Sequence, residues 1–208
     1  METADGGGRM KWGLRLFSIL VLVLLACTVI STSQAAAISS GYTGDGNRLN
    51  LSLLRVGDII AVSGVVMGGL ADVIIPGHFT HVAMYIGNGQ MIEAWKDGVR
   101  IISVTEVLKA TDAAIVRVST SDSIRQAAVN WAKTKVGYPY DYIWLTYVGG
   151  KQVYGSSYYC SELVWAAYLA VGGPDIDQNP GWSWKYGNNV APQEIVDDGD
   201  TYIVAYSS

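Results

Sequence analysis

Short apolar segments alternate with glycine-containing turns between residues 57 and 118 of this 208-residue chain. Gly87-Asn88-Gly89 and Lys96-Asp97-Gly98 are turn signals, and turns of this length join antiparallel strands. The strands expected here cover residues 57–62, 80–86, 91–95, 99–104 and 114–118. The pattern therefore predicts an antiparallel sheet.

Helical segments follow or interrupt these strands. The first long one opens at Ser123, with Gln126 three positions later, and its expected end is Gly137. Its apolar stripe consists of Ile124, Ala127, Ala128 and Trp131. A short helix is expected over 103–110 and a last strand over 202–206. Together these elements predict an α+β domain, with about five to six strands packed against helices.

The second long helix carries a cysteine at its start. Its apolar positions recur at helical spacing: Cys160, Leu163, Val164, Ala167, Tyr168 and Val171. Ser157 is the expected N-cap, and Gly172-Gly173-Pro174 ends the run. Cys160 is therefore expected in the first turn, where the helix dipole lowers a thiol pKa and backbone N–H groups can bind an oxyanion.

The N-terminus has the layout of a secretory signal. Arg9, Lys11 and Arg15 precede the apolar run 16–30, and the alanines 35–37 offer a cleavage site. We expect residues 1–37 to be a cleaved signal or a retained membrane anchor, residues 38–52 a linker, and 53–208 one domain. The protein is thus expected to be secreted or extracytoplasmic, with membrane attachment through this segment as the alternative.

Only two cysteines occur in the chain, and Cys27 lies inside the export segment. Lipidation at Cys27 is a minor alternative for this segment, and both Met1 and Met10 are candidate start sites. The folded domain then owns one thiol, Cys160, and can form no internal disulfide. An unpaired thiol in an exported domain is exposed to oxidation, so it either performs chemistry or is a small buried apolar group.

A nucleophilic thiol needs a base, and the chain has only two histidines, His78 and His81. His81 lies in the predicted strand 80–86, beside the small Ala83 on its own face. Glu93 follows twelve residues later across a short turn and can reach the second ring nitrogen. We therefore predict Cys160 as nucleophile, His81 as general base and Glu93 as the carboxylate that orients it.

Two classes of partner are not expected. His78 and His81 are three apart on a strand and face opposite sides, so no metal site and no cofactor are predicted. The formal charge is -4, and the 14 basic residues cluster only at 9–15, which excludes a nucleic-acid footprint. We expect a monomer that acts on a peptide or on an acyl-bearing small substrate.

Five motifs resemble the circularly permuted papain-like branch of the NlpC/P60 superfamily over residues 53–206: Gly57-Asp-Ile-Ile60, His81-Val-Ala-Met-Tyr-Ile-Gly87, Ile92-Glu-Ala94, Tyr140-Asp-Tyr142 and Tyr159-Cys-Ser-Glu-Leu163. The histidine strand precedes the cysteine helix, as in the YaeF/YiiX-like amidases. The resemblance implies a permuted papain-like fold, a cysteine hydrolase, and a catalytic triad of Cys160, His81 and Glu93. Tyr140, Tyr142 and Tyr159 lie in these motifs and are the candidate substrate-binding residues.

Three functions remain open at this level. The first is a thiol amidase or peptidase that cleaves peptide or isopeptide bonds, which could be derived from the cell wall. The second is a lipid acyl hydrolase or acyltransferase, favoured if the apolar loop 65–75 forms an exposed lip beside the thiol. The third is a binding module without turnover, in which Cys160 is only packed.

Overall fold

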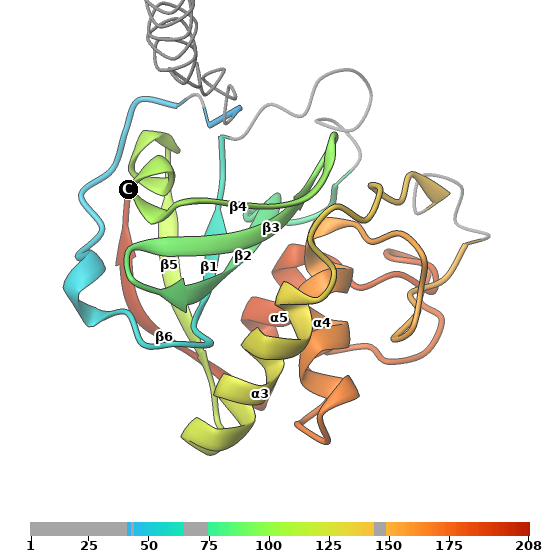
Figure 1. The fold of residues 1–208 in the computed structure, drawn as a ribbon. Helices are drawn as coiled ribbons and strands as arrows, with labels where there is room; N and C mark the ends of the chain where they lie inside the picture. The colour runs from blue at the N-terminus through green and yellow to red at the C-terminus, as the bar shows by residue number, and fades with distance from the viewer. Residues whose placement is uncertain (1–40, 43, 65–74, 144–148) are drawn as a thin grey trace, which may run out of the picture. The chain divides into compact units, whose positions relative to one another are not determined.

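The computed structural model describes residues 41–42, 44–64, 75–143 and 149–208, all within one unit of the chain, residues 40–208 (Figure 1). The expected signal or anchor, residues 1–37, lies outside these ranges, and so does nearly all of the apolar loop 65–75. No helix within the described ranges combines the length and the apolar character that a membrane span requires.

Six strands form one antiparallel sheet in the spatial order β4-β3-β2-β1-β5-β6 (Figure 1). Their bounds are β1 Ile59–Val62, β2 His81–Gly87, β3 Gln90–Trp95, β4 Gly98–Ser103, β5 Ala113–Val118 and β6 Thr201–Ser207. The central strands β1 and β5 are buried along their whole length, because the sheet is covered on both faces there. The predicted α+β class and the antiparallel sheet are confirmed.

Tight hairpins connect β2, β3 and β4 and fix the register of the sheet. The first turn contains Asn88 at φ 53° and Gly89 at φ 70°, the left-handed conformations that such turns require. At Gly98, φ is 113°, and a Cβ would lie only 2.5 Å from the carbonyl oxygen of Tyr138. The second hairpin places Glu93 of β3 directly opposite Arg100 of β4.

The helices are η1 Leu51–Leu53, η2 Val104–Lys109, α3 Asp122–Lys133, α4 Cys160–Ala170 and α5 Pro192–Asp197. The short helix expected at 103–110 is a 3-10 helix, in which Ser103 accepts a hydrogen bond from the Thr105 N–H. The short helix α5 was not expected, although Pro192 at its first position and Glu194 two residues later are typical of a helix start.

The N-cap of helix α3 lies two residues before the expected one, Ser123. Ser121 and not Ser123 caps it, since the Ser121 Oγ accepts from the Ile124 N–H at 3.2 Å. Of the predicted apolar stripe, Ala128 is buried and Ile124 and Trp131 pack against the core, but the buried face also includes Arg125, Val129 and Ala132 and is therefore rotated by part of a turn. The reason is Arg125, which donates to the carbonyl oxygens of Val118 and Thr120 and therefore faces inward.

Helix α4 is buried over residues 160–168 and packs against β2, β3 and α3. It begins after Tyr159, not after the expected N-cap Ser157. The Glu162 Oε2 accepts a hydrogen bond from the Tyr159 N–H at 3.1 Å, which satisfies one donor at the helix start. Cys160 is therefore the first residue of the helix and lies in the first turn, where the sequence pattern predicts it.

The described part of the expected linker 38–52 is built into the domain. Tyr42 and Leu49 are buried in the core, 3% and 5% exposed. Asn47 donates to the carbonyl oxygens of Val107 and Ala110 at 2.8 and 3.0 Å. Residues 41–42 and 44–50, here called the N-terminal strap, are irregular in backbone but do not behave as a linker, because buried side chains and hydrogen bonds hold them in place.

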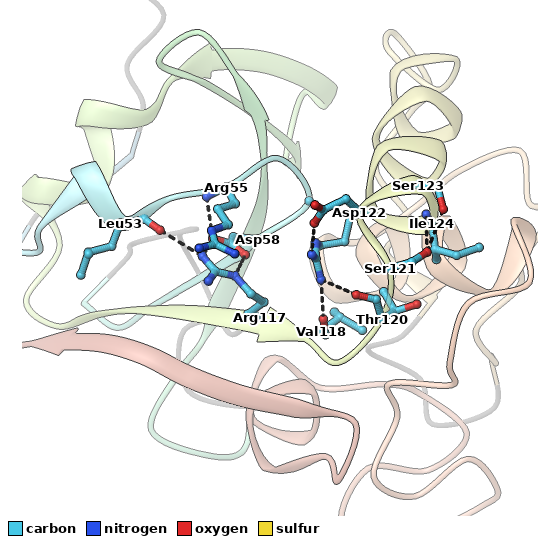
Figure 2. A network of polar contacts seen from close by, with 12 residues as sticks. Leu53, Arg55, Asp58, Arg117, Val118, Thr120, Ser121, Asp122, Ser123 and Ile124 are labelled. Carbon is cyan, nitrogen blue, oxygen red and sulfur yellow. Dashed lines mark hydrogen bonds and ion pairs between the residues drawn. The ribbon is translucent and has the colours of Figure 1, made fainter.

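A buried ion pair joins β5 to the turn before β1 (Figure 2). The Arg117 guanidinium donates to both oxygens of Asp58, at 2.7 and 2.6 Å, and to the carbonyl oxygen of Leu53 at 3.0 Å. Asp58 also accepts from the Arg55 N–H at 2.7 Å. Asp58 is fully buried, so its charge depends on these partners for compensation.

Replacing Asp58 with asparagine should lower the free energy of unfolding by about 3 kcal/mol, because the buried guanidinium of Arg117 loses its counter-charge. Urea denaturation measures this loss. The matched control is Asp122→Asn, which removes a carboxylate that pairs with Arg125 but whose side chain is 88% exposed. The control should cost about 1 kcal/mol or less, and equal losses for both variants would contradict the argument.

Candidate active site

Cys160, the first residue of α4, lies against an open pocket and is 3% exposed. Because it sits at the helix start, backbone N–H groups of the first turn, including those of Cys160 and Ser161, have no acceptor within the helix. Both residues line the pocket. An oxyanion formed next to the sulfur would meet these donors and the positive end of the helix dipole.

His81 is the first residue of β2 and is completely buried. The register that pairs Met84 with Ile92 places Glu93 one diagonal step from His81 on the same face of the sheet. The Glu93 Oε2 lies 2.7 Å from the His81 Nε2. A carboxylate acceptor at Nε2 fixes the proton on that nitrogen and leaves Nδ1 as the basic atom.

The Nδ1 atom of His81 is buried and makes no hydrogen bond within the described part of the chain. Burial lowers the pKa of His81, but the Cys160 thiolate and the Glu93 carboxylate act in the opposite sense and raise it to about 9. The Cys160 sulfur acts on the ring through its charge and through a hydrogen-bonding contribution, although the contact at Nδ1 does not reach the geometry of a full hydrogen bond. Such looseness is common before substrate binds.

The thiol responds in the complementary direction. Burial raises the pKa of Cys160, but the His81 imidazolium and the Val82 N–H outweigh this effect and lower the pKa below that of an ordinary thiol. A lowered thiol pKa beside a raised histidine pKa favours a thiolate–imidazolium pair, which is the reactive form of a cysteine nucleophile.

Glu93 has partners on both of its oxygens. Oε2 accepts from the Tyr42 hydroxyl at 2.8 Å as well as from His81, and Oε1 accepts from two nitrogens of Arg100, each at 2.8 Å. Burial raises the pKa of Glu93, but the hydrogen bond and charge of His81, then Arg100 and Tyr42, bring it below its usual value. The carboxylate is thus charged and held in one orientation.

Of the three residues proposed from sequence, the structure brings His81 and Glu93 within 2.7 Å of each other, and Cys160 interacts electrostatically with His81. The sequence analysis missed Arg100 and Tyr42. Arg100 had a usable signal, because the turn at 96–98 pairs residue 93 with residue 100 across the hairpin. Tyr42 had none, since it lies 51 positions before its partner in a segment without periodic pattern.

A second buried carboxyl, Glu162, lies in the first turn of α4 and was also missed. Its Oε1 accepts from the Gln152 N–H at 2.8 Å, and its Oε2 accepts from Tyr159. Burial raises the pKa of Glu162 to about 8. Glu162 ties the loop before the helix to the helix start, and thereby helps to fix the position of Cys160.

The pocket beside Cys160 has an empty volume of about 470 Å³, including its mouth open to solvent. Most of its described lining is aromatic or aliphatic, with Tyr140, Tyr159, Tyr186, Ile75, Pro76 and Val190 as its main members. Lys185 is the one charged side chain among the described lining residues. The cavity therefore suits an uncharged, apolar group.

Two of the three candidate substrate-binding tyrosines line this pocket. Tyr140 and Tyr159 do so, and the Tyr159 hydroxyl accepts from the Val190 N–H at 2.9 Å. Tyr142 is not among the described lining residues. Its side chain is 52% exposed, and its hydroxyl donates to the carbonyl oxygen of Lys96.

His78 is not among the described residues that line the pocket. Its Nε2 is 3.3 Å from the Asp112 Oδ2, and its side chain is 53% exposed. Across the described ranges, no three histidine, cysteine, aspartate or glutamate side chains are grouped so that they could hold a metal ion. Only one carboxylate accompanies His78, so this pair does not have the donors of a protein metal site.

Two known proteins are similar to this chain. YycO of Bacillus subtilis (strain 168), an uncharacterized protein, is 35% identical over 103 residues, which are 49% of this chain and 41% of YycO. The crystal structure of the metalloprotein YiiX from Escherichia coli O157:H7 aligns with a TM-score of 0.55 at 21% identity, covering 73% of this chain and 96% of YiiX. The second likeness shows the fold.

The family comparison covers most of the domain. The sequence profile of the permuted papain-like amidase enzymes, YaeF/YiiX, matches residues 54–205. This range contains Cys160, His81 and Glu93. It begins at residue 54 and therefore does not include the N-terminal strap. The chain belongs to the permuted papain-like amidase enzymes, the YaeF/YiiX or C92 family.

Proposed function

We propose that this chain hydrolyses amide bonds, with Cys160 as nucleophile, His81 as general base and acid, and Glu93 as the group that orients His81. The observation that carries the proposal is the buried His81, which is bonded to Glu93 through Nε2 at 2.7 Å and coupled electrostatically to Cys160 at the start of α4. Its family of amidases supports amide hydrolysis in general.

The reaction follows from these positions. The Cys160 thiolate attacks the carbonyl carbon and forms a C–S bond, while the oxygen becomes an oxyanion near the first N–H groups of α4. The C–N bond then breaks, and the leaving amine takes the proton from the His81 imidazolium. In the second half, His81 takes a proton from water, which attacks the thioester and releases the carboxylic acid and the thiolate.

The pocket supports a choice of substrate. Its aromatic and aliphatic lining favours an apolar group on one side of the scissile bond, and Lys185 can attract an anionic group elsewhere in the substrate. A peptide or isopeptide with one bulky apolar residue meets both conditions. An extracytoplasmic location is part of this proposal and is supported by the basic, apolar and small-residue order of residues 1–37.

A lipid acyl hydrolase or acyltransferase is the second candidate. The same apolar lining could accept a fatty acyl chain. Trp182 and Trp184 precede Lys185 in the chain and are 52% and 89% exposed. Their ring centroids are 4.6 Å apart. Exposed tryptophans are typical of surfaces that meet a membrane interface, which favours this candidate.

Trapping the acyl-enzyme tests the proposal and separates the candidates. We expect the full chain, acid-quenched during turnover of an N-acyl-phenylalanine anilide, to carry the acyl mass on the peptide that contains Cys160. Peptide-bond analogues should outcompete long-chain fatty acyl esters of equal concentration. Turnover of the long-chain esters alone would favour the lipid candidate, and hydrolysis without an adduct on Cys160 would contradict the mechanism.

A further inference from the structure

The N-terminal strap delivers a side chain into the active site. The Tyr42 hydroxyl donates to the Glu93 Oε2, the same oxygen that binds His81, at a distance of 2.8 Å. Tyr42 is 3% exposed, so the bond is shielded from water. The family profile begins at residue 54, and Tyr42 therefore lies outside the region that defines the family.

The Tyr42 ring also contacts the two aromatic rings around the base. It meets the His81 ring edge to face, with centroids 5.9 Å apart, and stacks on Trp95 at 6.0 Å. Trp95 itself meets His81 edge to face at 5.1 Å. Tyr42 and Trp95 together restrict the orientation of the imidazole.

The strap is shaped for this approach. Gly41 has φ 74°, and a Cβ there would lie 2.2 Å from the Trp95 ring, so only glycine allows the chain to pass. Beyond Tyr42, the Gly44 N–H donates to the Lys109 carbonyl at 2.7 Å, and Asn47 binds the carbonyls of Val107 and Ala110. The position of Tyr42 is thus fixed from both sides.

We propose that Tyr42 is a positioning residue for the base, and that the functional unit of this enzyme begins at the strap and not at the family boundary. The inference rests on the proposed function of Cys160 and His81. Through its hydroxyl, Tyr42 holds Glu93 in the orientation that keeps the proton of His81 on Nε2 and leaves Nδ1 for the nucleophile.

The charged and titratable groups that face Glu93 come from four elements. They are Tyr42 of the strap, His81 of β2, Arg100 of β4 and, beyond the imidazole, Cys160 of α4. The Asp97 Oδ2 lies 3.4 Å from the Arg100 Nη1, so Asp97 acts on Glu93 through Arg100. The hydrogen bond from Tyr42 lowers the pKa of Glu93, so removing this bond makes the carboxylate easier to protonate in acid. A protonated Glu93 no longer stabilises the His81 imidazolium by its charge.

The test is Tyr42→Phe in the full chain, which removes the hydroxyl and keeps the ring. We expect kcat for amide hydrolysis to fall about three- to tenfold with KM nearly unchanged, because Tyr42 is not among the described lining residues of the pocket. The rate of Cys160 alkylation by iodoacetamide falls toward acid pH, and the midpoint of this fall, here called the acid limb, should move about half a pH unit upward.

Tyr206→Phe is the matched control, since the Tyr206 hydroxyl donates to another carboxylate, Asp112, at 3.0 Å. The control should leave kcat and the acid limb unchanged. A Tyr42→Phe chain with an unchanged acid limb and kcat, or a Tyr206→Phe chain with the same changes, would overturn the inference, whatever happens to the melting temperature.

A second variant, Asn47→Ala, loosens the strap without touching the site and should shift the acid limb in the same direction by less. It decides the question alone if Tyr42→Phe does not fold, because an unchanged profile would then overturn the role of the strap. Alkylation of the unaltered chain distinguishes a failure of the proposed function of Cys160 from a failure of the proposed role of Tyr42. If its own alkylation follows an ordinary thiol pKa of about 8.5, the function of Cys160 fails, and not merely the role of Tyr42.

Discussion

Replacing Cys160 with alanine should abolish amide hydrolysis, with a loss of at least about 1000-fold in kcat. The thiolate supplies the bond-forming electron pair, and no other cysteine lies within the described residues. The neighbouring Ser161 cannot replace it, because its Oγ donates to the Val190 carbonyl at 2.7 Å and lies 4.0 Å from the sulfur. Initial rates on the anilide substrate measure the loss.

The fold should survive this change. Cys160 is buried, but the alteration removes a single sulfur atom, which costs about 1 kcal/mol of stability through a small cavity. The same substitution at the only other cysteine of the sequence, Cys27→Ala, is the matched control and should keep full activity. If Cys160→Ala retained a tenth of the rate while folded, the thiol would not be the nucleophile.

The sheet was predictable because its signals are local. Turns with glycine at positions 89 and 98 fix the hairpins, and the resulting pairing places Glu93 near His81. The place of Cys160 in the first turn of α4 was predictable for the same reason, since apolar spacing and Gly172 locate the helix, although its N-cap is Tyr159 and not the expected Ser157. The three chemically central residues could be proposed because each lies on an element that periodicity can locate.

The rest of the site depends on long-range contacts that periodicity cannot report. Tyr42 reaches Glu93 across 51 positions from a segment whose glycine and asparagine content is typical of a linker. Buried charges misled the pattern in a different way: Arg125 turns inward to satisfy two carbonyl oxygens, so the buried face of α3 is not its most apolar stripe. Burial of a polar group is decided by its partners, and these are not visible in the local sequence.

Replacing His81 with alanine should have the second largest effect, a loss of about 100- to 10,000-fold in kcat/KM, because it removes both the base and the acid of the reaction. The thiol should change as well. In the unaltered chain the imidazolium lowers the pKa of Cys160, so the thiolate forms below the ordinary thiol pKa of about 8.5. Without His81, burial is the largest remaining influence and raises the pKa, so alkylation at neutral pH should slow at least about tenfold.

Two variants calibrate this result. His78→Ala changes the other histidine of the chain, which pairs with Asp112 and does not line the described pocket, and should leave both measurements unchanged. Glu93→Gln removes the charge but keeps an oxygen that can accept from the His81 Nε2, so a small but measurable part of the activity should remain. Equal and mild losses in Cys160→Ala, His81→Ala and Glu93→Gln would contradict a triad.

The two pH profiles of the unaltered chain should separate at their alkaline ends. His81 has its pKa raised to about 9, so the imidazolium that protonates the leaving amine is present below this value and is lost as the pH rises through it. Turnover should therefore decline above about pH 9. Alkylation needs only the thiolate, which stays ionised, and should not decline. Turnover that stayed constant above this pH while the chain remained folded would show that His81 is not the general acid.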